Sequence, residues 1–251
     1  MSKLNTLRRT VAALSVAALG VVASIDAASA ATVIGRLDSV SGGTVQRIID
    51  NSMVGSQGWT DLAAGVFSFT RTGGDYGGTL LPNVASVFYA LCVEPQENVN
   101  FGGSYTYNVL PLSAGAENIG GMGATRAGYL AELLYGVNPL QSALTNVEAA
   151  ALQVAIWEIV RETDPLPFNV ATGHTRFQNA SNASVLPTAQ AWLNTYVNDG
   201  QPSPQLANVL ALVSPENQDM VGFIAVPEPL SLALLGIGLA GLSSTRRRKS
   251  V

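Results

Sequence analysis

The sequence of 251 residues predicts an α+β fold, in which a β-rich core of sandwich or barrel type carries a helical subdomain and the chain ends in a single hydrophobic helix. In the first half, short apolar runs are separated by Gly, Asn, Ser and Thr, a pattern typical of strands joined by turns. After Gly123 the apolar residues recur with the period of an amphipathic helix. Near the end, residues 230–242 are apolar and uncharged, which is the pattern of a hydrophobic helix.

The strand predictions rest on three runs of the first half. Residues 65–69 and 84–93 are rich in apolar and aromatic side chains, and residues 105–109 alternate with period two. The glycine-rich residues 71–79 contain no lysine and do not lead into a helix, so we expect a hairpin loop and not a phosphate-binding loop.

Three helices are predicted in the second half. Residues 127–135 form the first, which we expect to end at Gly136. The second begins at Asn146, a favourable N-cap residue, and runs to residue 162. Residues 188–197 form the third candidate.

Residues 1–30 have the three parts of a secretory signal peptide: a basic start, an apolar stretch and small residues at a cleavage site. We expect cleavage between Ala30 and Ala31. The alternative is a retained anchor helix, but the apolar stretch of residues 11–25 is shorter than the roughly 20 residues that span a bilayer. The exported domain is therefore expected to cover residues 31–225.

Residues 226–251 form a predicted sorting and anchor segment. Pro227, Glu228 and Pro229 interrupt regular structure, because proline lacks an N–H donor and restricts the residue before it. The apolar residues 230–242 follow, and the basic residues 246–249 favour the cytoplasmic side of a membrane. An ordinary tail anchor would share the helix and the charges, but it would not need the Pro-Glu-Pro element.

This order of features resembles the PEP-CTERM sorting signal of Gram-negative bacteria that make exopolysaccharide, which an exosortase reads. The resemblance implies an exosortase-type sorting enzyme as a partner and transient anchoring in the inner membrane. It places the exported domain at the cell envelope, the outer surface or the extracellular matrix of a Gram-negative bacterium.

The exported domain contains six arginines, no lysine and fifteen acidic residues, which gives a net charge of −9. Nucleic acid is therefore not expected as a partner, since phosphate binding needs a basic face. No residues have the spacing of metal ligands, so no metal and no cofactor are expected. The single cysteine, Cys92, cannot form an internal disulfide. It is either a small buried apolar residue or a reactive thiol.

Gln153 occupies an unusual position on the second predicted helix. In a helical projection it lies inside the apolar face, whereas Glu158, Arg161 and Glu162 lie on the opposite side. Burying a primary amide without partners costs roughly 1–3 kcal/mol. The amide must therefore be satisfied by hydrogen bonds or consumed by a reaction.

Cys92 lies in the predicted buried strand of residues 84–93 and offers such a reaction. A thiol and a glutamine side chain in a dry pocket can condense with loss of ammonia to an internal thioester. An external amine can later attack the acyl group and release the thiol.

Two short segments carry a resemblance to a known family. Leu91-Cys92-Val93 and the Leu-Gln-Val-Ala-Ile-Trp sequence of residues 152–157 resemble the two signature elements of the bacterial thioester domain, found in surface adhesins. The similarity extends over residues 65–197. Two features depart from the family: many members carry a small hydroxyl residue where this chain has Leu152, and their usual setting is a Gram-positive wall protein.

The resemblance implies a thioester-type extracellular domain with a β-rich core and a helical part. It implies that Cys92 and Gln153 form the thioester crosslink and that Trp157 packs beside them. The implied partner is an amine-bearing surface protein or matrix polymer. The absence of lysine is compatible with a thioester that must not react with its own domain, or with drift in composition.

The expected function is covalent binding, in adhesion or matrix attachment, and not enzymatic turnover. A hydrolase in which Cys92 is the nucleophile and His174 the base is an alternative, although His174 lies in a predicted loop with no accompanying oxyanion signature. A structural matrix protein, in which Cys92 and Gln153 share no bond, is the other alternative.

Overall fold

The computed structural model describes residues 31–49, 60–75, 87–139, 144–163, 166–202 and 209–223. The predicted signal peptide and the predicted sorting segment, with its hydrophobic helix, lie outside these residues. Among the helices of the described part, none combines the length and the apolar character needed to cross a membrane.

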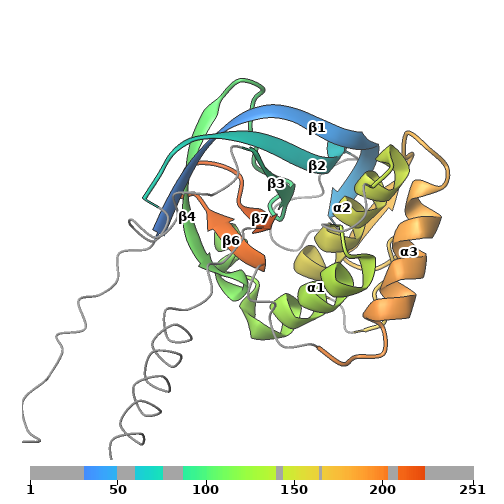
Figure 1. Cartoon of the computed structure of the whole chain (residues 1–251). Helices are drawn as coiled ribbons and strands as arrows, with labels where there is room; N and C mark the ends of the chain where they lie inside the picture. Colours follow the sequence, from blue (N-terminus) through green and yellow to red (C-terminus); the bar gives the residue numbers. More distant parts are fainter. Residues whose placement is uncertain are drawn as a thin grey trace, which may run out of the picture.

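The described strands form one antiparallel sheet that closes on itself (Figure 1). Its order is β2-β3-β7-β6-β4-β1-β5, and β1 also pairs with β2. Six strands thus form a closed barrel, and β5 extends the sheet from the far end of β1. The strands are β1 (Ala31–Ile49), β2 (Thr60–Gly73), β3 (Val87–Cys92), β4 (Ser104–Pro111), β5 (Thr175–Gln178), β6 (Val209–Val213) and β7 (Met220–Phe223).

The predicted β-rich core is confirmed, and its form is a barrel. The runs 65–69 and 105–109 lie within β2 and β4, and the run 84–93 contains β3. Residues 71–73 of the predicted hairpin loop belong to β2, which corrects the start of that loop. Strands β5, β6 and β7 lie outside the predicted runs, because four or five residues are too few to show a clear period.

The barrel closes because β1 is long enough to pair with β4 through its first residues and with β2 along most of its length. The two long strands approach closely where Gly42 faces Gly65. A Cβ atom at Gly42 would lie 2.1 Å from the Ala64 carbonyl oxygen, and one at Gly65 would lie 1.7 Å from the Ser41 carbonyl oxygen. Only glycine fits at both positions, so Gly42 and Gly65 permit the close approach of β1 and β2 and allow the two strands to curve.

The three predicted helices are present with shifted ends, and they gather on one side of the barrel (Figure 1). Helix α1 (Gly123–Val137) begins earlier than predicted and continues through Gly136 to a left-handed C-cap at Asn138. Helix α2 is Asn146–Arg161, and α3 is Val185–Tyr196. Two short 3-10 helices, η2 (Leu112–Ala114) and η3 (Glu117–Ile119), precede α1.

The N-cap of α2 is Thr145, and the predicted cap, Asn146, is the first residue of the helix. The Glu148 N–H donates to the Thr145 hydroxyl, and the Thr145 N–H donates to the Glu148 carboxylate. This reciprocal capping box satisfies two backbone donors at the start of the helix. The start of α2 is thereby fixed at Thr145.

Helix α2 is the centre of the molecule. It packs against β1, β2 and β3 on one side and against α1 and α3 on the other, so every residue from Ala149 to Val160 is buried. The polar side of the predicted amphipathic helix therefore does not face solvent. Glu158 and Glu162 are buried because residues 169–175 cover them and donate backbone N–H groups to their carboxylates.

The barrel interior is aromatic. Phe69 stacks on Phe88 with ring centroids 5.1 Å apart and meets Tyr107 edge to face at 6.1 Å. The Tyr107 hydroxyl is buried and has no hydrogen-bond partner among the described residues. The nearby Tyr105 hydroxyl, in contrast, accepts from the Asn100 N–H and donates to the Asn100 carbonyl oxygen.

Replacing Tyr107 by phenylalanine is expected to raise the free energy of unfolding by about 1–3 kcal/mol, because it removes a buried hydroxyl that has no partner. Urea denaturation at neutral pH measures the change. Tyr105→Phe is the matched control and is expected to lower stability, since the Asn100 N–H loses its acceptor and the Asn100 carbonyl oxygen keeps only its bond from the Gly103 N–H. A loss of stability in Tyr107→Phe would contradict the prediction.

Candidate functional site

Cys92 is the last residue of β3 and is fully buried. Because side chains alternate along a strand, it lies on the same side of β3 as Phe88 and Ala90, which face the barrel interior. On one edge, β3 pairs with β7, where Cys92 is opposite Met220. The N–H of the following residue, Val93, donates to the Asp219 carbonyl oxygen on that same edge.

The other edge of β3 explains why the backbone of Cys92 needs a partner. In an antiparallel strand, the N–H and C=O of one residue point to the same neighbour, and successive residues alternate between neighbours. Val93 bonds to Asp219, the residue before β7, so the backbone of Cys92 points toward β2. The pairing between β2 and β3 ends at Ala90, opposite Phe67. Cys92 therefore presents two polar groups beyond the end of the ladder.

The side chain of Gln153 fills this position. The Cys92 N–H donates to Gln153 Oε1 at 2.9 Å, and Gln153 Nε2 donates to the Cys92 carbonyl oxygen at 2.7 Å. The carboxamide thus makes both hydrogen bonds that a further strand would make. Both residues are fully buried, and α2 carries the glutamine to β3 although the two residues are 61 positions apart.

Trp157 brings a third group to the site. It lies one turn after Gln153, on the same face of α2. Its indole N–H donates to Cys92 Sγ at 3.3 Å. The ring is buried and stacks on Phe177 of β5, with centroids 6.2 Å apart and planes inclined by 12°.

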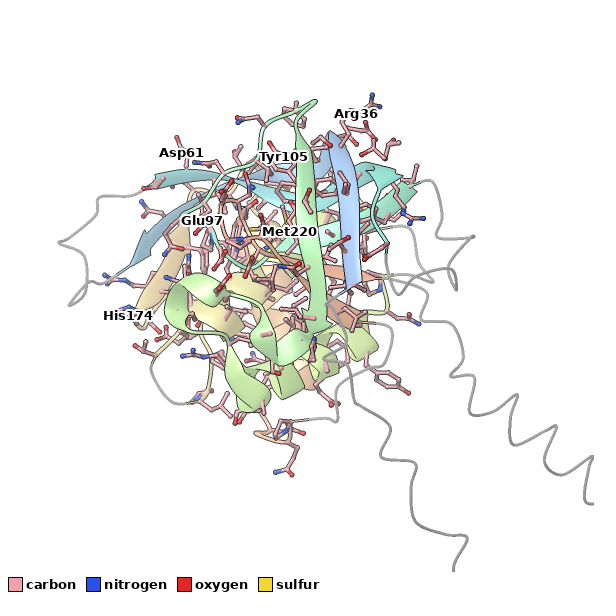
Figure 2. The ribbon with its side chains drawn as sticks, turned by 90° about the vertical axis from the view of Figure 1, so that its left-hand side faces the viewer. Arg36, Asp61, Glu97, Tyr105, His174 and Met220 are labelled. Carbon is pink, nitrogen blue, oxygen red and sulfur yellow. The ribbon has the colours of Figure 1, made fainter. Side chains whose placement is uncertain are left out.

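The structure therefore brings together Cys92, Gln153 and Trp157. It does not bring His174 to this group. Figure 2 shows His174 at the edge of the molecule, well away from Met220, the strand partner of Cys92. The backbone N–H of His174 donates to the Glu162 carboxylate at 3.1 Å.

Two buried carboxylates beside Cys92 were not predicted from the sequence. Glu94 accepts from the backbone N–H groups of Asn118 and Asp219, at 2.8 and 2.9 Å. Asp219 accepts from the backbone N–H groups of Glu117 and Ser214, at 2.9 and 2.8 Å. The two acids thus hold η3 and the turn before β7 around the end of β3. No sequence pattern links them, since 125 positions separate Glu94 and Asp219.

Arg161, at the end of α2, joins the same region. Its guanidinium donates to the Asn118 side-chain oxygen at 2.9 Å. Burial lowers the pKa of Arg161, and the negative charge of Glu94 opposes this effect. Helix α2 therefore meets η3 through a charged group next to the buried acids.

An open pocket of about 650 Å³ lies at the start of α1, with Arg126, Tyr129 and Phe168 among its lining residues. The Arg126 guanidinium donates to the Glu162 carbonyl oxygen at 2.8 Å. Neither Cys92 nor Gln153 lines this pocket. Among the described residues, no group of three or more His, Cys, Asp or Glu side chains is arranged to hold a metal ion.

Burial raises the pKa of Asp219 to about 6, although the N–H groups of Glu117 and Ser214 act in the opposite direction. The ordinary value is 3.8, so the folded protein holds this proton more tightly than the unfolded chain does. The contribution of Asp219 to stability is therefore greatest in acid and is lost as the pH rises through about 6.

We expect the wild-type protein to lose stability relative to Asp219→Asn as the pH is raised from about 4 to about 7. Urea unfolding of both proteins across this range measures the difference. Asp38→Asn is the control, because Asp38 is exposed and its hydrogen bond from Thr70 lowers its pKa, so its titration lies below this range. A constant difference between wild type and Asp219→Asn would contradict the expectation.

Comparison with known families concerns the end of the chain. Residues 225–249 match the model of the PEP-CTERM protein-sorting motif, and this match includes Pro227, Glu228 and Pro229. No curated protein and no solved structure matches the chain. The motif marks the chain as an exported protein that an exosortase sorts to the envelope or the surface, which confirms the predicted sorting signal. The match lies wholly outside the described barrel and helices.

Proposed function

We propose that this exported protein forms an internal thioester between Cys92 and Gln153 and uses it to capture amine-bearing partners. The observation that carries the proposal is the pair of hydrogen bonds between the Gln153 carboxamide and the backbone of Cys92. These bonds hold the carboxamide at the residue that carries the buried thiol, and the sulfur of that thiol has an N–H donor in Trp157. The resemblance of the two segments to thioester domains supports the same pairing.

Formation of the bond needs no co-reactant. Cys92 Sγ attacks the amide carbon of Gln153, a C–S bond forms and the C–N bond breaks. The thiol proton leaves with the amide nitrogen as part of ammonia. Burial favours this reaction because it excludes the water that would hydrolyse the product.

The backbone of Cys92 assists the attack. When sulfur adds to the amide carbon, negative charge develops on Gln153 Oε1. The Cys92 N–H already donates to this oxygen at 2.9 Å, so it acts as a fixed oxyanion donor. The hydrogen bond from Nε2 to the Cys92 carbonyl oxygen is released with the ammonia.

In the capture step, an external amine is the nucleophile and the sulfur of Cys92 is the leaving group. A primary amine attacks the thioester carbonyl, a C–N bond forms and the C–S bond breaks. A proton from the amine passes to sulfur and regenerates the thiol. The partner becomes joined to the side chain of residue 153 through an amide. The partner is therefore an amine-bearing surface protein or matrix polymer, in adhesion or in matrix attachment.

The composition and the sorting signal support this function. Residues 31–225 contain no lysine, so no lysine side chain of the domain competes with an external amine. The PEP-CTERM motif directs the chain to the envelope or surface, where it meets partners from outside the cell.

Intact mass of the purified domain tests the proposal. The expected mass is lower than that of the unmodified chain by one ammonia, and methylamine treatment replaces the loss by a methylamide adduct. Cys92→Ala and Gln153→Ala are expected to abolish both changes. Gln190→Ala is the matched control, because the Gln190 amide also bonds to backbone, at Phe168 and Val170, and should leave both changes intact.

Fresh wild-type protein with an unmodified mass and a titratable thiol would overturn the thioester. That result would favour a second candidate, a structural matrix protein in which Gln153 only joins α2 to β3. The two hydrogen bonds to Cys92 favour this alternative, since they satisfy the carboxamide without a reaction. In that case Gln153→Ala would still destabilise the fold.

The sorting signal is tested by cell fractionation. Deleting residues 226–251 is expected to release the exported domain into the medium, because the segment that the exosortase reads is lost. Replacing Pro227 and Pro229 by alanine should impair sorting while leaving the apolar and basic residues in place. Pro202→Ala, an exposed proline outside the motif, is the control. Unchanged envelope attachment of the deletion variant would contradict the prediction.

A further inference from the structure

The sulfur of Cys92 receives a hydrogen bond from the Trp157 indole N–H at 3.3 Å. A sulfur atom accepts hydrogen bonds weakly when it is protonated and much better as a thiolate. The donor therefore favours the negative form of sulfur over the neutral thiol. This difference matters for chemistry because the thiolate is the reactive form.

The indole is held rigidly in this position. It lies one turn from Gln153 on a helix that is buried from Ala149 to Val160, so the two side chains project together toward β3. One face of the ring is held by the stack on Phe177, which belongs to a strand paired with β1. The N–H thus needs no rearrangement when charge appears on sulfur, which is the condition for electrostatic stabilisation.

We propose that Trp157 is a catalytic residue that stabilises negative charge on Cys92 Sγ, both when sulfur attacks Gln153 and when sulfur leaves during capture of the amine. This inference rests on the proposed thioester. The indole N–H only donates, so Trp157 neither takes nor gives a proton in either step. It acts through the hydrogen bond alone.

Two different N–H donors face the two atoms on which negative charge develops during the reaction. The Cys92 backbone N–H faces Gln153 Oε1, where charge develops on the tetrahedral intermediate. The Trp157 N–H faces Sγ, where charge develops as the thiol proton passes to the Gln153 nitrogen and again, during capture, before sulfur takes a proton from the amine. Helix α2 supplies the tryptophan and the glutamine, so one helix sets the geometry of both groups relative to β3.

Trp157→Phe tests the inference, because phenylalanine keeps an aromatic ring beside Phe177 and removes the N–H donor, at the cost of a cavity where the larger indole was buried. Ammonia loss and methylamine capture, each followed by mass, are both expected to slow about tenfold or more, since a hydrogen bond to a charged group is lost. Trp192→Phe on α3 is the matched control and should react at the wild-type rate. Circular dichroism verifies that both variants are folded. Wild-type rates in folded Trp157→Phe would overturn the inference.

A second measurement separates this inference from the proposed function. In a Gln153→Ala background no thioester forms, and the ultraviolet absorbance of the thiolate, followed against pH, reports the charge on the buried sulfur directly. Adding Trp157→Phe is expected to move the profile to higher pH. An unchanged profile overturns the role of Trp157. A shifted profile, combined with an unmodified wild-type mass, supports the effect on sulfur and overturns the thioester.

Biosynthetic replacement of tryptophan by a fluorinated tryptophan provides a variant that keeps the shape of the side chain. Fluorine withdraws electron density and makes the N–H a stronger donor, so capture of methylamine is expected to be faster. The same replacement in Trp157→Phe should have no effect on the rate. Acceleration in both proteins would assign the effect to another tryptophan and would contradict the inference.

Discussion

The structure depends on the contact by which Gln153 completes the hydrogen bonding of β3. On the side of β3 that faces β2, the pairing stops at Ala90, so the backbone N–H and C=O of Cys92 lie beyond the end of that ladder. A buried N–H and a buried C=O without partners would together cost several kcal/mol. The carboxamide of Gln153 satisfies both, and in doing so fixes the register of α2 against the barrel. The same contact defines the candidate site, so the fold and its chemistry rest on one side chain.

Buried acidic groups carry out a related task around that contact. Glu94, Glu158, Glu162 and Asp219 each accept a backbone N–H group from a segment that is neither a strand nor a long helix. Irregular segments have polar backbone groups that must be satisfied when they are buried. Carboxylates are suited to this because each offers two acceptor oxygens. Although only 12% of the residues are charged, several of the acidic side chains thus have a structural role.

The sequence predicted the parts of the site that depend on local periodicity. A buried run around Cys92 and the helical projection of Gln153 were enough to suggest that a thiol and an amide approach each other. The position of Trp157 beside them was implied by the resemblance to thioester domains. The barrel closure could not be predicted, because β6 and β7 are short and pair with partners distant in the chain. Burial of Glu158 and Glu162 could not be predicted either. Residues 169–175 cover both side chains, and a helical projection gives no information about other segments that pack on the helix.

The position of β7 has a mechanical consequence. This strand lies between β3 and β6, and its last residue, Phe223, precedes the sorting motif at residue 225 by only a short segment. Tension between an envelope anchor and a partner bound at residue 153 would therefore enter the domain through β7. The load would pass by backbone hydrogen bonds into β3, which carries Cys92. Under the proposed function, the sorting segment and residue 153 of α2 would be connected through β7 and β3, and this path would bypass most of the barrel.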